Sequence, residues 1–143
     1  MVCVDARPGA QHLIRRAWRQ SDRRHAELLA VFVETPAWAR SGPEERRALE
    51  ENLRFAEDLG AAVLRVAGPD VAKVLAQVAN EKNISSIVLG HSRHGRLHEF
   101  LRGSIASNVL RLVRGVDVHV VAEAPKHETW VAPSPQVRSG PLS

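Results

Sequence analysis

The sequence predicts an α/β fold in which helices cover both faces of a parallel sheet. Short apolar runs alternate four times with segments whose apolar residues recur every three or four positions, the spacing of one helix face, and a fifth apolar run closes the series. The run LLAVFVE, at residues 28–34, is apolar nearly throughout, as expected for a strand that is covered on both sides. Such alternation indicates parallel strands joined by right-handed crossovers.

The predicted strands are short apolar runs that end at turn residues. Their ranges are 1–5, 28–34, 61–67, 84–89 and 117–122. The first, MVCVD, is followed by the turn Arg7-Pro8-Gly9. Cys3 is the only cysteine, so no internal disulfide is possible, and its apolar neighbours predict a buried packing residue.

Amphipathic spacing and terminal signals predict the four helices between the strands. The first has an apolar face made of Leu13, Ile14, Ala17 and Trp18. The segment 35–42 is expected to be an irregular loop before the second helix. Boundary residues mark the other helices: Pro43 and Gly60 for the second, Asp70 and Asn83 for the third, Ser104, Arg114 and Gly115 for the fourth.

Composition and charge fit a single domain with a substantial core. The chain has 143 residues, of which 44% are hydrophobic and 25% charged. The net charge of +4 suits anionic ligands or partners, but basic residues are mixed with acidic ones and aromatics are few, so no nucleic-acid surface is indicated. No apolar run approaches the roughly 18 residues needed to span a membrane. No signal peptide is visible, so the expected compartment is the cytoplasm.

The composition changes near the end of the fifth predicted strand. From Glu123 onward the chain is rich in Pro, Ser and polar residues. A segment of this kind buries too little apolar surface to fold by itself. We therefore expect a folded domain over 1–122 and a flexible tail over 123–143.

A loop rich in arginine follows the fourth predicted strand and indicates an anion site. Its notable residues are Gly90, Arg93, Arg96, Arg102, Gly103 and Ser104. The first N–H groups of the next helix lack intrahelical partners and carry partial positive charge. Gly103 permits close approach of a phosphate, and Ser104 adds a hydroxyl donor. A plain connection remains the alternative, because the pattern is neither GxGxxG nor GxxxxGK[ST].

Asp5 ends the first predicted strand, and ligands of parallel sheets bind beyond the carboxyl ends of the strands. If the first and fourth strands are neighbours, Asp5 and the arginine loop face one crevice. The carboxylate then accepts from a ligand, or it orders the following turn. Both roles stay open at this point.

Other polar residues give weaker signals. The loop histidines His91, His94 and His98 have no fixed ligand spacing and no nearby cysteine, so a metal site is not favoured. His119 is expected to be a packed or edge residue of the last strand. Trp18 and Trp38 are expected at the surface or at an interface.

Five segments carry a resemblance to a known family. They are VCVD, LLAVFVETP, ENLRFAEDLGA, IVLGHSRHGRLHEFLRGS and VDVHVV. Over residues 1–122 the chain resembles the universal stress protein domain, in the form found in the KdpD family of potassium-sensing histidine kinases. The resemblance implies five parallel strands in the order 3-2-1-4-5.

Nucleotide-binding members of that family carry G-x2-G-x9-G-[ST] in the loop after the fourth strand. Here the middle glycine is replaced by Arg93, so the resemblance implies weak or absent MgATP binding, with ATP or another adenine nucleotide still possible. Motifs that bind cyclic di-AMP in some KdpD proteins match poorly at residues 5–7 and 34–38. The implied ligand-binding residues are Asp5, Val33, Gly90, Ser92, Arg93, Arg96, Arg102, Gly103 and Ser104.

The resemblance implies a non-catalytic regulatory domain that binds a ligand or a partner in a KdpD-type potassium-sensing two-component system. Kinase activity is expected only of a parent or partner protein, since the chain has no P-loop and no phospho-acceptor histidine box. Expected partners are other domains of a sensor kinase or a stress protein, without membrane contact by this segment. The alternatives are a freestanding ATP-binding stress protein and a module that dimerises through the strand 117–122.

Overall fold

The computed structural model describes residues 1–91 and 105–122. Five strands form one parallel sheet in the order β3-β2-β1-β4-β5, which confirms the predicted fold class and order. The strands are β1 (Val2–Cys3), β2 (Leu29–Glu34), β3 (Ala62–Ala67), β4 (Ser86–His91) and β5 (Asp117–Ala122). The helices are α1 (Ala10–Arg23), the 3-10 helix η1 (Pro36–Arg40), α2 (Pro43–Asp58), α3 (Val71–Glu81) and α5 (Ile105–Leu112).

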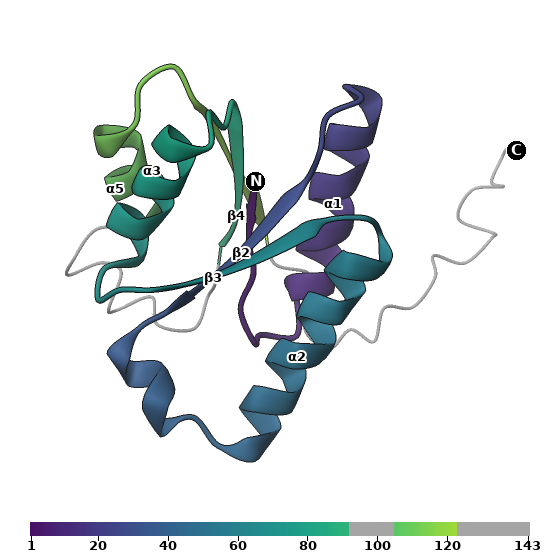
Figure 1. The fold of residues 1–143 in the computed structure, drawn as a ribbon, viewed down its shortest axis with the longest axis vertical. Helices are drawn as coiled ribbons and strands as arrows, with labels where there is room; N and C mark the ends of the chain where they lie inside the picture. Colours follow the sequence, from purple (N-terminus) through teal and green to yellow (C-terminus); the bar gives the residue numbers. More distant parts are fainter. Residues whose placement is uncertain (92–104, 123–143) are drawn as a thin grey trace, which may run out of the picture.

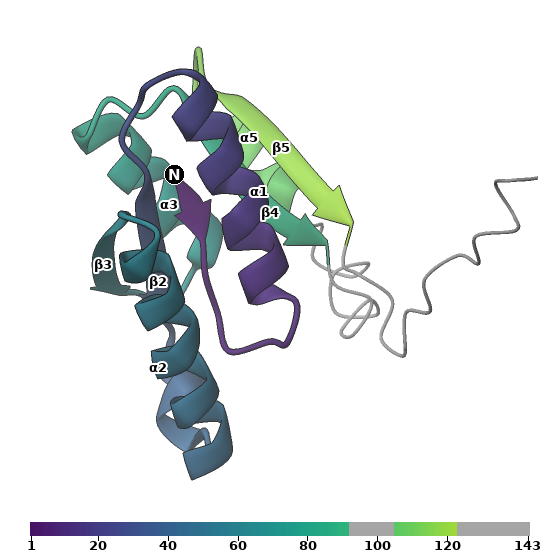
Figure 2. The ribbon, with the colours of Figure 1, turned by 90° about the vertical axis from the view of Figure 1, so that its right-hand side faces the viewer.

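Helices cover both faces of the sheet. Figure 1 shows α1 and α2 on one side of the strands, with α3 and α5 on the other. Figure 2 shows α1 running along the sheet in front of β4 and β5. Alternate residues of β1 and its continuation enter opposite cores: Val2 and Val4 pack with α1 and α2, whereas Met1 packs with α3 and α5. The central strand therefore packs against a helical layer on both sides.

The register of β1 brings the carboxyl ends of β1 and β4 side by side. Val2 pairs with Ala30 of β2 and with Val88 of β4. The backbone N–H of Val4 donates to Val31 at 2.8 Å, after which the chain leaves the sheet. The first and fourth strands are thus neighbours, which is the condition under which Asp5 was expected to face the segment after β4.

Some predicted boundaries were wrong by two or three residues. The fourth strand begins at Ser86, two residues later than predicted, and runs through Gly90 to His91. The cause is the exit from α3: Asn83 adopts a positive φ of 54°, and the N–H of Ile84 still donates to Ala79. Gly90 consequently lies inside the strand, where it pairs with Val121.

Other predicted ends differ by a similar amount. β1 is shorter than its predicted range, the last helix ends at Leu112, and η1 forms inside the segment predicted to be irregular. Pro43 begins α2 as predicted, and Gly60 follows its end with a φ of 101°. The tail predicted over 123–143 lies outside the described residues.

Two tryptophans were expected at the surface or at an interface, and this was only partly right. Trp18 and Trp38 are both half-buried and pack against the core on the α1 and α2 side. Trp38 meets Phe32 edge-on, with ring centroids 5.1 Å apart, and the Arg46 guanidinium lies 5.3 Å above its ring. Cys3 is partly buried instead of fully buried.

Candidate functional site

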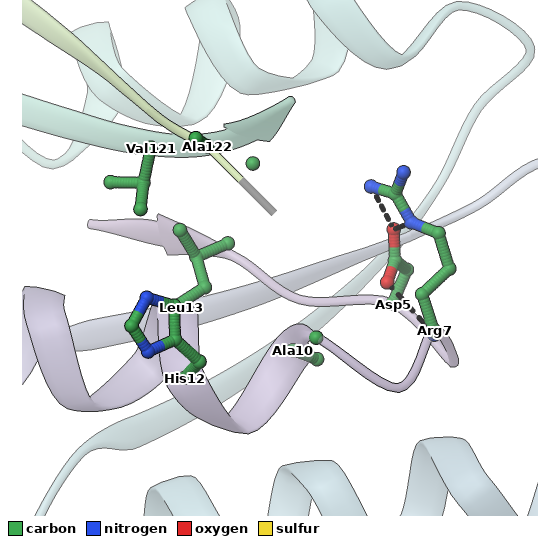
Figure 3. A pocket seen from close by; sticks show the side chains of 9 residues that line it. Asp5, Arg7, Ala10, His12, Leu13, Val121 and Ala122 are labelled. Atoms are coloured by element: carbon green, nitrogen blue, oxygen red, sulfur yellow. Dashed lines mark hydrogen bonds and ion pairs between the residues drawn. The ribbon is translucent and has the colours of Figure 1, made fainter. Parts of the chain in front are cut away.

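A pocket lies beyond the carboxyl ends of β1, β4 and β5, where α1 begins. It comprises about 320 Å³, including space open to solvent. This is the edge at which parallel sheets bind ligands. Figure 3 shows side chains from the loop after β1, from α1 and from β5 around it. The lining residues are Asp5, Arg7, Gly9, Ala10, His12, Leu13, Gly90, Val121 and Ala122.

The loop between β1 and α1 brings a carboxylate and a guanidinium to the pocket wall. Asp5 Oδ1 accepts from the backbone N–H of Arg7 at 3.0 Å, and Oδ2 accepts from Arg7 Nε at 2.8 Å. Arg7 Nη2 also lies 2.7 Å from Oδ2. Figure 3 shows the Arg7 side chain folded back over Asp5. Asp5 therefore orders the turn, as one of its two predicted roles required, and holds a cation at the wall.

The buried side-chain amide of Asn52, on α2, anchors this loop through hydrogen bonds to its backbone. Its Nδ2 donates to the carbonyl oxygen of Asp5 at 2.8 Å and to that of Arg7 at 3.3 Å. Its Oδ1 accepts from Gln11 Nε2 at 3.3 Å. The amide thus links α2 to both the loop and the first turn of α1.

Gly90 supplies the β4 side of the pocket. A Cβ atom added there would lie 3.4 Å from Leu13 Cδ2, which is ordinary van der Waals contact. The fold therefore tolerates a side chain at this position, and close packing does not explain the glycine. Its small size instead leaves space between β4 and α1.

The structure brings together only part of the predicted ligand-binding set. Asp5 and Gly90 both line the pocket. Val33 does not: it lies inside β2, 7% exposed, and its side chain packs in the core with α3 and α5. The remaining six, all in the segment after β4, lie outside the described residues: Ser92, Arg93, Arg96, Arg102, Gly103 and Ser104.

Two residues that shape the site were not predicted from the sequence. Arg7 was seen only as part of a turn, and Asn52 was not singled out. A signal for Asn52 does exist, because it occupies the buried stripe of α2 beside Leu49, Leu53 and Ala56. A polar residue on a buried helix face needs a hydrogen-bond partner. That partner is not readable from the sequence.

The pocket wall carries both charged and apolar groups. Within residues 1–91 and 105–122, no group of three or more His, Cys, Asp or Glu side chains is placed to hold a metal ion. Burial and the nearby Asp5 carboxylate raise the pKa of the Cys3 thiol to about 12, so the thiol stays neutral. The groups that line the pocket are the Asp5–Arg7 ion pair, the His12 imidazole, two glycines and apolar side chains.

A second hollow lies between α1 and the edge strand β5. It is lined by basic side chains, including Arg16, Arg23 and Arg24, above Val88 and Val121. His119, expected to be a packed or edge residue, is exposed on β5, and its Nε2 lies 3.2 Å from Gln20 Nε2. The expectation of an edge residue is thus confirmed.

Comparison with known proteins shows the family to which the fold belongs. The model of the universal stress protein family matches residues 1–122, all of the described sheet and helices. The chain belongs to the universal stress protein family. The match ends at the last residue of β5, where the folded domain was predicted to end.

Curated relatives of this stress protein domain are sensor proteins. It is 32% identical over 122 residues to sensor protein KdpD of Escherichia coli, covering 85% of this chain and 13% of that protein. It is also 32% identical over 142 residues to sensor protein KdpD of Mycobacterium tuberculosis, covering 96% of this chain and 16% of that protein. The domain therefore spans about a seventh of these relatives.

Solved universal stress proteins share the fold. One, crystallised in complex with cAMP, has a TM-score of 0.65 and 23% identity, over 86% of this chain and 96% of that one. Another, from Burkholderia pseudomallei, has a TM-score of 0.56 and 25% identity, over 84% and 93% of the two chains. In the part of this domain that the structure describes, no helix has the length and apolar character required to cross a membrane.

Proposed function

We propose that this stress protein domain is a non-catalytic regulatory module of a KdpD-type potassium-sensing system in the cytoplasm. The similarity to KdpD sensor proteins supports the assignment. The domain accounts for only 13% to 16% of those proteins, so any kinase activity belongs to a larger protein or to a partner. Other domains of a sensor kinase, or a second stress protein, are its proposed partners.

The pocket formed by Asp5, Arg7 and Gly90 is the observation that carries a ligand-binding role. It lies at the edge of the sheet where ligands of parallel α/β folds bind. The Arg7 guanidinium suits a phosphate or a carboxylate, both of which can accept two parallel N–H bonds. We assign the ligand to the class of adenine mononucleotides, because related folds were solved with cAMP and with dAMP. Contacts between the ligand and the segment 92–104 remain a prediction, and Arg93 is predicted to weaken the binding of MgATP.

Two measurements on the purified chain test this assignment. Mass spectrometry identifies small molecules that are released on denaturation, and calorimetry compares AMP, ATP and cyclic di-AMP. We expect AMP to bind more tightly than MgATP. Micromolar ATP binding, about −8 kcal/mol, with weaker AMP binding favours a freestanding ATP-binding stress protein instead. If none of the three nucleotides binds, the proposed ligand-binding role of the pocket is wrong.

A second candidate function is self-association through β5. This strand forms one edge of the sheet, and its Val120 side chain is 49% exposed. An exposed edge with an apolar side chain is a template for pairing with another strand.

A further inference from the structure

In the described parts of the chain, Asn52 is the one polar or charged residue that is buried as a whole. It is 6% exposed and lies on α2 between Leu49 and Leu53, which are 1% and 2% exposed. An apolar residue at this position would extend the core stripe without any need for hydrogen bonds. The presence of an amide therefore indicates a task that packing alone does not require.

The bonds of Asn52 fix the orientation of its amide. Both loop partners, the backbone oxygens of Asp5 and Arg7, are acceptors, so the nitrogen must face them. The oxygen then faces Gln11 Nε2, which donates. A flipped amide would set oxygen against two carbonyl oxygens. The three contacts are thus mutually consistent and hold one geometry.

The anchored loop is the wall of the pocket. The last sheet bond in this part of the chain is from Val4 to Val31 at 2.8 Å. Beyond it, Asp5 binds the backbone and side chain of Arg7, while the N–H of Ala10 donates to the Arg7 carbonyl at 3.1 Å. These bonds are local and do not fix the loop against the rest of the domain. Asn52 supplies a link to another element.

We propose that Asn52 is a positioning residue for the ligand pocket, which it serves by clamping the loop that presents Asp5 and Arg7. The amide acts through the loop backbone and does not line the pocket itself. It sets the Arg7 guanidinium at the wall before a ligand arrives, which lowers the ordering cost of binding. The inference rests on the proposed ligand-binding function and names the residue that prepares that site.

The decisive variant is Asn52→Leu, which keeps a similar volume and removes both donors. Hydrogen exchange followed by NMR reports on the loop without any ligand, through the amides of Arg7 and Ala10. We expect these amides to exchange about tenfold faster relative to the core amides of Val4 and Val88. Calorimetry is expected to show AMP binding about tenfold weaker.

Leu53→Ala is the matched control, because it removes a buried side chain from the adjacent position of α2. It lowers the stability of the whole domain, so core amides that exchange through global unfolding accelerate, and the ratio of loop to core exchange does not rise. AMP affinity is expected to stay within about twofold of the wild type, because the anchored loop is unchanged. A loss of AMP binding in this control equal to that of Asn52→Leu would overturn the inference.

An unchanged ratio of loop to core exchange in Asn52→Leu also overturns it, whatever the binding result. If Asn52→Leu does not fold, Asn52→Ala decides, because it also removes the donors to the Asp5 and Arg7 carbonyl oxygens. Loop exchange equal to the wild type in that variant counts against the clamp. If the wild type binds no AMP, the proposed function fails, while the exchange ratio still decides the role of Asn52.

Discussion

Asp5 uses both of its carboxylate oxygens inside the loop that it begins. The bonds from the Arg7 backbone and from its Nε and Nη2 atoms engage three of about four acceptor positions. A ligand that relies on Asp5 as an acceptor thus meets a carboxylate that is already occupied. This favours ligands whose anionic group contacts Arg7 over neutral ones that only donate.

Gly90→Ala tests whether the space beside β4 is used. The added methyl group makes ordinary contact with Leu13 Cδ2, so we expect the free energy of unfolding to change by less than about 0.5 kcal/mol. The same methyl projects into the pocket, so AMP affinity is expected to fall about tenfold. Thermal unfolding and calorimetry measure the two effects. Unchanged affinity would show that AMP does not occupy this side of the pocket.

Gly68, before α3, is required for a different reason. A Cβ atom there would lie 2.5 Å from Val74 Cγ2, far inside contact distance. We expect Gly68→Ala to destabilise the domain by about 1–3 kcal/mol in urea unfolding, through overpacking. In a Val74→Ala background the clash is absent, so the penalty should largely vanish. An equal penalty in both backgrounds would place its cause in the backbone instead.

An exposed ion pair joins helix α2 to strand β3. Arg65 Nη2 donates to both oxygens of Glu50, at 2.7 and 2.9 Å. Hydrogen bonding from Arg65 lowers the pKa of Glu50 below its ordinary value of 4.5. Because both side chains are largely exposed, the pair contributes under about 1 kcal/mol.

The pH dependence of this pair follows from the sign of the shift. A lowered carboxyl pKa stabilises the folded state above pH 4.5, and the contribution is lost as pH falls through the folded-state pKa. Arg65→Gln should therefore reduce the free energy of unfolding at pH 7 and have little effect near pH 3. Urea unfolding at both values measures this. A penalty that is larger at the lower pH contradicts the assignment.

The elements themselves were largely readable from the sequence, because each strand is a distinct apolar run and each helix has one apolar face. The start of β4 could not be predicted from the sequence, because Ile84 is as apolar as Ile87. The positive φ of Asn83 keeps Ile84 outside the sheet. The site was readable in part. Asp5 and Gly90 follow from the rule on strand ends, whereas Asn52 acts on carbonyl groups 47 and 45 residues away.

Among the strands that the structure describes, β5 forms one edge of the sheet. If the domain self-associates there, Val120→Lys should convert a dimer to a monomer, because a charge on the edge opposes strand pairing. Sedimentation velocity at micromolar concentration measures the change. Ala37→Lys, on the exposed η1, adds the same charge elsewhere and should leave the dimer intact. A wild type that is monomeric at these concentrations removes this candidate function.

The central strand contributes only Val2 and Cys3 to the sheet, yet it joins the two halves of the domain. One half, β2 and β3 with α2, is assembled from residues close in sequence, but the β1–β4 pairing closes a loop through most of the chain. Closing so long a loop costs entropy and slows folding. The pocket takes its walls from the loop after β1 and from α1, together with β4 and β5, so it needs the β1–β4 pairing. A refolding chain therefore cannot acquire the complete binding site before its longest-range pairing has formed, which makes ligand capture a kinetic marker of finished folding.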